Sequence, residues 1–133
     1  MSTKLKLLMV VSSILLGLAG IVAVFAPQEL LAALQAPVTQ PLPVVIQLMG
    51  ALYLAFALTN WTAKDSVIGG IYNRPISLGN FAHFTVGALV LAKYQVSDGA
   101  PALFIVVLIV YAVFALIFGW LVFVHSGIAG KQE

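Results

Sequence analysis

The sequence predicts an all-α integral membrane protein in which four transmembrane helices form a compact bundle. One observation is composition: 62% of the 133 residues are hydrophobic and 8% are charged, whereas about 25% of residues are charged in ordinary soluble domains. The other is that four apolar stretches approach or meet the roughly 20 residues that cross a bilayer core. We expect a single membrane domain over 1–133, with spans at Leu7–Ala26, Val44–Trp61, Ile76–Ala92 and Ala102–Val124.

The starts of the spans are marked by charge and by proline. Lys4 and Lys6 precede the first span, whose 20 residues exceed the roughly 7–15 of a secretory signal core, so we expect it to be retained. Proline is tolerated in the first helical turn, where its missing N–H would be unpaired in any case. Pro43, Pro75 and Pro101 therefore predict where the second, third and fourth spans begin.

The segment between the first two spans predicts a short helix. Pro27 opens it, Leu30, Leu31 and Leu34 fall on one helical face, and Pro37 closes it. An amphipathic helix of this kind lies in the membrane interface with its apolar side toward lipid. The alternative interpretation is an irregular, partly buried loop.

Basic residues predict the orientation of the chain. Lys and Arg concentrate in the cytoplasmic loops of membrane proteins. Five of the six basic residues would lie on the side of the two termini, and Lys93 alone would lie opposite. We therefore expect both termini in the cytoplasm, segments 27–43 and 93–101 outside, and an inner (plasma) membrane of a bacterium as the location.

Small residues predict the faces through which the helices pack. Lipid is as apolar as leucine, so membrane helices associate through small residues and polar side chains. Helical spacing aligns such residues on one face of each span. We expect close helix contacts at Ser13, Gly17, Gly20, Gly50 and Gly87.

Polar side chains gather in the predicted cytoplasmic half of the spans. An ionisable group inside a span is a functional-site candidate by default. His83 therefore either handles a ligand or proton, or is a neutral imidazole bonded to Asn80, Asn60 or a backbone carbonyl. The candidate ligand-binding set is Tyr53, Asn60, Arg74, Asn80, His83, Tyr111 and His125.

Three members of this set have a structural alternative as well. Tyr53 and Tyr111 would lie near the middle of the membrane, where each hydroxyl needs a partner; they could bond each other or Gln47. Arg74 precedes Pro75 and could bind an anionic group at the start of a helix, or could simply reach lipid headgroups as an anchor.

Several chemistries are disfavoured by the sequence. Six scattered basic residues form no stripe for nucleic acid, and a chain without cysteine has no thiolate chemistry. A haem held by His83 and His125 is unexpected, since the two would lie at different depths. We expect no metal, no cofactor and, on balance, no enzyme, because HExxH, GxSxG and P-loop motifs are missing and the acidic residues stand in loops or the tail: Glu29, Asp65, Asp98 and Glu133.

Short motifs also suggest a family. They are FAPQEL at 25–30, QLMGALY at 47–53, GGIYNRP at 69–75 and GNF at 79–81. Their order resembles that of small four-span bacterial membrane proteins of the DoxX-like and DUF4345-like kind, across the whole chain. The resemblance implies a membrane bundle and carries over no catalytic residue.

These observations favour a non-enzymatic membrane protein. Its expected role is an accessory or assembly subunit, or a helical bundle that associates with itself, with membrane lipids, other subunits or its own copies as partners. The alternative is a small-molecule or lipid-binding protein, including a carrier, that uses a polar pocket at Asn60, Asn80 and His83.

Overall fold

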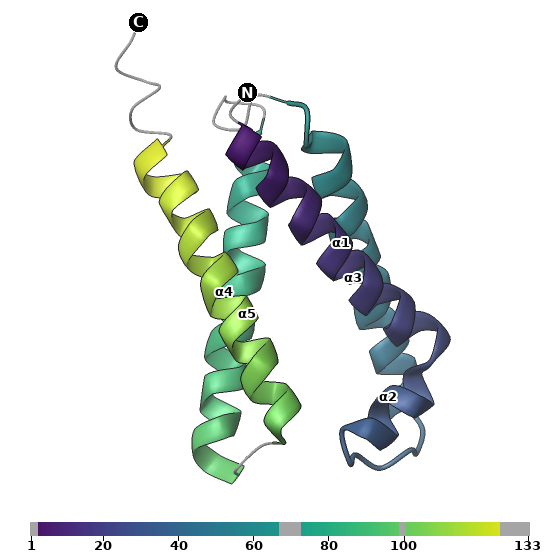
Figure 1. Ribbon diagram of the computed structural model, residues 1–133. Coiled ribbons are helices and arrows are strands. Elements are labelled where there is room, and N and C mark those ends of the chain that lie inside the picture. Colours follow the sequence, from purple (N-terminus) through teal and green to yellow (C-terminus); the bar gives the residue numbers. More distant parts are fainter. Residues whose placement is uncertain (1–2, 67–72, 99–100, 126–133) are drawn as a thin grey trace, which may run out of the picture. The chain divides into compact units, whose positions relative to one another are not determined.

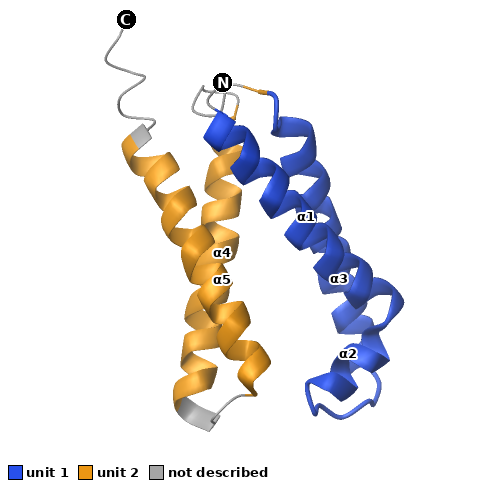
Figure 2. Ribbon diagram, in the orientation of Figure 1, with its two compact units in different colours: residues 1–65 blue, residues 66–133 orange. Residues whose placement is uncertain are grey.

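The computed structural model describes residues 3–66, 73–98 and 101–125 and confirms the all-α fold class. The described residues form five α-helices and a final turn of π-helix, and none of them forms a β-strand (Figure 1). Two compact units divide the chain, residues 1–65 and residues 66–133 (Figure 2), and each is described by itself.

Four of the helices are long and apolar enough to cross a membrane, so the chain is a small integral membrane protein. They carry no more than two charged residues in any qualifying 18-residue window. The elements are α1 (Thr3–Phe25), α2 (Pro27–Ala33), α3 (Leu42–Ala63), α4 (Arg74–Asp98), α5 (Ala102–Trp120) and the π-turn Leu121–His125.

Helices α1, α3 and α4 extend beyond the predicted spans, most of all α4, whereas α5 ends at Trp120 and is followed by the π-turn. Helix α4 continues through Lys93, which the sequence analysis had placed in a loop, to Asp98. The apolar stretch ends near Ala92, but the sequence contains neither proline nor glycine from position 88 to position 98. Nothing in the local sequence therefore breaks the helix there. As predicted, Pro43 and Pro75 lie in the first turns of their helices.

Unit 1 is an antiparallel pair of long helices, α1 and α3, with α2 folded against both of them. The predicted short helix is confirmed and begins at Pro27 as expected. Of the three leucines on its predicted apolar face, Leu31 is buried at 2% exposure, because α2 folds back onto α1 and α3. Leu30 and Leu34 are partly exposed.

The end of α2 is closed by a pair of backbone hydrogen bonds. The Gln35 N–H donates to the Ala32 carbonyl at 3.0 Å, and the Ala36 N–H donates to the Leu31 carbonyl at 2.9 Å. This is the Schellman arrangement, which needs a residue in the left-handed region just after the helix. Gln35 takes that place with φ at 56°, a conformation that an L-residue adopts at some cost.

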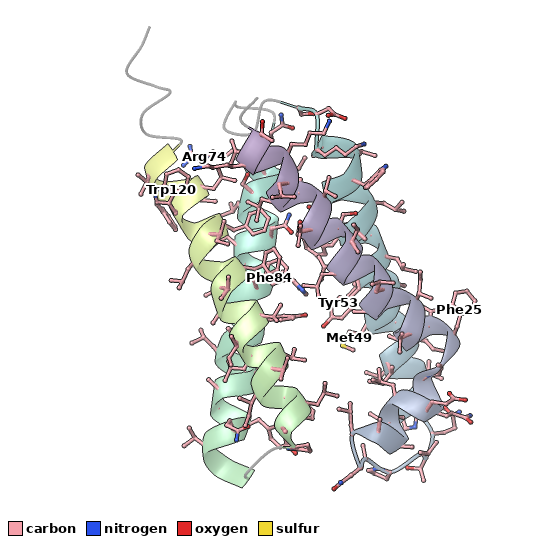
Figure 3. All side chains as sticks on the ribbon, viewed as in Figure 1. Phe25, Met49, Tyr53, Arg74, Phe84 and Trp120 are labelled. Atoms are coloured by element: carbon pink, nitrogen blue, oxygen red, sulfur yellow. The ribbon has the colours of Figure 1, made fainter. Side chains whose placement is uncertain are left out.

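Unit 2 is a second antiparallel pair, α4 and α5, held by aromatic rings. Phe84 is fully buried and stacks on Phe114, with ring centroids 4.8 Å apart, and on Phe118 at 5.9 Å (Figure 3). Nearer the end of α5, Phe81 meets Phe123 edge to face at 5.3 Å. Stacked and edge-on rings at these separations stabilise a pair beyond the area they bury.

Candidate functional site

Glycine lets the backbones of α1 and α3 come into contact in unit 1. A Cβ atom added at Gly20 would lie 2.9 Å from the Gly50 carbonyl oxygen and 3.0 Å from the Leu54 nitrogen. One added at Gly50 would lie 2.9 Å from the Gly20 oxygen. Gly17 is less crowded, since its added Cβ would stand 3.6 Å from Ala57 Cβ. The structure thus places these three predicted packing glycines along one helix contact.

Polar side chains of unit 1 reinforce the same contact. Ser13 Oγ donates to the Ala57 carbonyl at 2.7 Å. Asn60 Nδ2 donates to Ser12 Oγ at 3.0 Å, and Ser12 Oγ donates to the Met9 carbonyl at 3.1 Å. Asn60 and Ser12 are fully buried. Asn60, a predicted ligand residue, therefore links α3 to α1, through a serine that the sequence analysis did not single out.

Gln47 closes the other end of the helix pair. Its Nε2 donates to the Val24 carbonyl at 3.1 Å. Val24 is in the last turn of α1, where carbonyls have no partner within the helix. The side chain of α3 therefore satisfies one of the terminal carbonyls of α1.

A charged cluster stands at the opposite end of unit 1. Lys6 Nζ lies 2.6 Å from Asp65 Oδ1, and Lys64 Nζ lies 3.6 Å from Asp65 Oδ2. The hydrogen bond from Lys6 holds the pKa of the Asp65 carboxyl below its usual range. Lys64 also lies 4.2 Å from the centroid of the Trp61 ring. These contacts join the start of α1 to the end of α3.

His83 and Tyr111 form a polar contact between the helices of unit 2. Tyr111 Oη and His83 Nε2 are 3.2 Å apart, and their rings are 5.4 Å apart. Gly87, one turn beyond His83, makes room for this arrangement: a Cβ there would overlap the Tyr111 ring. The predicted packing residue Gly87 and the predicted ligand residues His83 and Tyr111 thus belong to one contact.

Ser77, Asn80 and His83, which follow one another at three-residue spacing, are named here the α4 polar row. Ser77 and Asn80 are buried, at 3% and 1% exposure. Asn80 Nδ2 donates to the Ile76 carbonyl at 2.9 Å. The Ser77 hydroxyl is buried and has no hydrogen-bond partner among the described residues. The row runs about 9 Å along the helix at 1.5 Å per residue.

The predicted ligand residues are divided between the two units. Tyr53 and Asn60 are on α3, while Asn80, His83 and Tyr111 belong to unit 2. Arg74 opens α4, and the figure shows it near the same end of unit 2 as Trp120 (Figure 3). His125 ends the π-turn, but its side chain is not among those that the structure describes. The structure therefore does not test a haem held by His83 and His125. No group of three metal-ligating side chains occurs among the described residues.

Some contributors could have been found from the sequence and others could not. Phe114 has the helical spacing of Tyr111 and Phe118, and this periodicity was a signal from which its place among the stacked rings could have been predicted. Ser12 stands beside Ser13, but only the position of α3 shows that both hydroxyls face it. Nothing in the sequence pattern indicated the π-turn that ends α5.

Comparison with protein-family models, with curated proteins and with solved structures finds no match for this chain. The resemblance to DoxX-like and DUF4345-like proteins therefore stays a prediction.

Proposed function

We propose that this chain is a non-enzymatic membrane subunit that helps to assemble a larger membrane complex or associates with itself. The observation that supports this best is that the buried polar side chains of unit 1 form hydrogen bonds within the helix pair. Ser12, Ser13 and Asn60 bond across or along the α1–α3 contact, so they build a closely packed helix pair. A pair built in this way is suited to serve as a scaffold within the bilayer.

The surface of each pair is consistent with partners that lie in the membrane. Large apolar side chains point outward, among them Leu18 at 62% exposure and Leu116 at 75%. Such side chains can be covered by lipid or by another apolar helix. The acidic residues of the sequence stand outside the four spans, which favours an assembly role over acid–base chemistry within the bilayer.

Native mass spectrometry in a mild detergent tests this proposal. We expect either a multiple of the 14.1 kDa chain mass or the chain with a second polypeptide at a fixed ratio. Dilution into excess detergent should leave the ratio unchanged. A single chain that carries only lipid or a small molecule would contradict the proposal. An unrelated four-span protein purified in parallel controls for lipid carried over from the membrane.

A second candidate, a small-molecule or lipid-binding protein, is favoured by unit 2. The supporting observation is the buried Ser77 hydroxyl, which has no partner in the part of the chain that the structure describes and is on the same helix as His83 of the His83–Tyr111 pair. In this case His83→Gln should fold normally and lose a co-purifying ligand, because an amide does not titrate near neutral pH. The neighbouring exposed Ala82→Gln is the control. Equal ligand content in both variants would remove this candidate.

We further propose that both termini face the cytoplasm across a bacterial inner membrane. Lys6 and Lys64 lie at the same end of unit 1, which agrees with the grouping of basic residues on one side. Single cysteines at Thr39 and at Gln132 would report the orientation in this cysteine-free chain. An impermeant thiol reagent on intact cells should label position 39 and spare position 132; the reverse pattern would exclude this orientation.

A further inference from the structure

We propose that the α4 polar row is a hydrated path that brings water, and with it protons, from the Arg74 end of α4 to the His83–Tyr111 pair. This goes beyond the assembly role proposed above. It also restricts the ligand of the second candidate to solutes that arrive from water rather than from lipid.

The Ser77 hydroxyl lacks a hydrogen-bond partner among the described residues. Inside a membrane span, a polar group without a partner is unfavourable, since no bulk water is present to bond it. Ser77 is 3% exposed, and its Oγ has no partner among the described residues. Enclosed water molecules commonly satisfy such groups by bonding two to four polar atoms at once. A water at Ser77 would meet that need.

Polar side chains continue along α4 beyond Ser77. Asn80 follows one turn deeper and is 1% exposed, with its Nδ2 held by the Ile76 carbonyl. That bond directs the amide back along the helix toward its Arg74 end. His83 comes next, with its Nε2 on Tyr111 Oη at 3.2 Å. Hydroxyl, amide, imidazole and phenol thus succeed one another from the end of the helix into the span.

The two faces of α4 differ in polarity. The opposite face exposes only apolar side chains over the same length: Leu78, Ala82 and Val86. The exposed apolar side chains thus lie on one side of the helix and the α4 polar row on the other; the buried Thr85 hydroxyl, which also has no partner among the described residues, lies outside the row. Tyr111 is a titratable side chain that α5 presents to His83, while Arg74, Lys93 and Asp98 are the charged residues near the ends of α4 itself. In this proposal His83, which contacts Tyr111, is the group at the inner end of the path that exchanges protons with the water.

Cysteine accessibility tests the path directly, because the chain contains no cysteine of its own. Ser77→Cys replaces one small polar atom by another, and Leu78→Cys is the matched control on the apolar face. Each variant is reconstituted in lipid nanodiscs, which leave both faces of the bilayer accessible, and is treated with a cationic, membrane-impermeant methanethiosulfonate. Only the thiolate reacts, and apolar surroundings raise the thiol pKa. Circular dichroism and elution volume establish that each variant is folded.

We expect Ser77→Cys to react at least about tenfold faster than Leu78→Cys, since one unit of pKa corresponds to a tenfold change in thiolate. Asn80→Cys should also react faster than the deeper control Ala82→Cys. Adding Ser77→Leu should slow the reaction of Asn80→Cys to the control rate, because the path to Asn80 passes Ser77.

Equal rates at positions 77 and 78 would overturn the proposal and would indicate that the Ser77 hydroxyl turns to a carbonyl of its own helix in a dry site. If Ser77→Cys does not fold, Asn80→Cys with and without a leucine at position 77 decides the same question. An unaltered Asn80→Cys rate would overturn the path. Neither measurement depends on a partner subunit, so failure of the path and failure of the assembly role remain distinguishable.

Discussion

Replacing Gly20 by alanine should destabilise the α1–α3 pair, whereas the same change one turn away at Gly17 should not. The added Cβ at position 20 would stand 2.9 Å from the Gly50 oxygen, and ordinary contact begins at 3.4 Å. Three atoms obstruct it: this oxygen, the Leu54 nitrogen at 3.0 Å and the Leu54 Cγ at 2.9 Å. The first two are backbone atoms, so rotation of the Leu54 side chain cannot by itself relieve the overlap. At position 17 the added Cβ would stand 3.6 Å from Ala57 Cβ, an ordinary distance.

The size of the effect follows from the separation that the helices must undergo. To increase the distance between the added Cβ and the Gly50 oxygen from 2.9 Å to 3.4 Å, the two helices must separate by about 0.5 Å. Such a gap loses roughly a quarter of the dispersion energy of each contact on that face. Overpacking of this kind costs about 1–3 kcal/mol. The gain in helix propensity from glycine to alanine, up to about 1 kcal/mol, is common to both variants and cancels in the comparison. We therefore expect Gly20→Ala to be less stable than Gly17→Ala by about 1–3 kcal/mol.

Reversible unfolding in mixed micelles, followed by far-ultraviolet circular dichroism, measures this difference. The wild type and Ile14→Ala, a change on the exposed face of α1, are the references. Gly50→Ala should resemble Gly20→Ala, because each added Cβ meets the backbone of the other glycine. If Gly20→Ala and Gly17→Ala unfold at the same denaturant concentration, the close approach at Gly20 is not what holds the pair together.

Three further predictions concern other contacts. Gly87→Ala should lose about 1–3 kcal/mol through overlap with the Tyr111 ring, and Tyr111→Leu should abolish most of that loss in a double-mutant cycle of unfolding free energies; additive losses would contradict the contact. Gln35→Gly should leave the free energy of unfolding unchanged or raise it by up to about 1 kcal/mol in the same assay. A left-handed L-residue costs roughly 1–2 kcal/mol, and the greater freedom of glycine in the unfolded chain offsets about 0.4–1 kcal/mol of that relief. A clear loss of stability would exclude relief of backbone strain. The lowered pKa of Asp65 predicts a contribution to stability that is present above the ordinary aspartate pKa and is lost as the pH falls through the lower pKa of the folded state. The unfolding midpoint should therefore depend less on pH in Asp65→Asn than in the wild type. Parallel pH profiles of the two proteins would argue against the Lys6 contact.

Much of the fold follows from local properties of the sequence. Apolar length and low charge determine that four helices can cross a membrane, because backbone groups in hydrocarbon must be satisfied within the segment. Pro43 and Pro75 mark helix starts through the same local chemistry, and Pro27 opens the short helix as predicted. Helix α4 continues past the predicted span to Asp98, since hydropathy detects the apolar core and not the point where the helix stops.

The pairing of side chains was decided by tertiary structure. Helical spacing put Asn60 on a face with Gly50, yet its actual partner, Ser12, is 48 positions away in the sequence. Likewise, the spacing aligned His83 with Gly87, but the ring that lies over Gly87 and reaches His83 comes from α5. The physical reason is that periodicity determines which residues share a face of one helix, whereas the register and rotation of the opposing helix determine which atoms those residues meet.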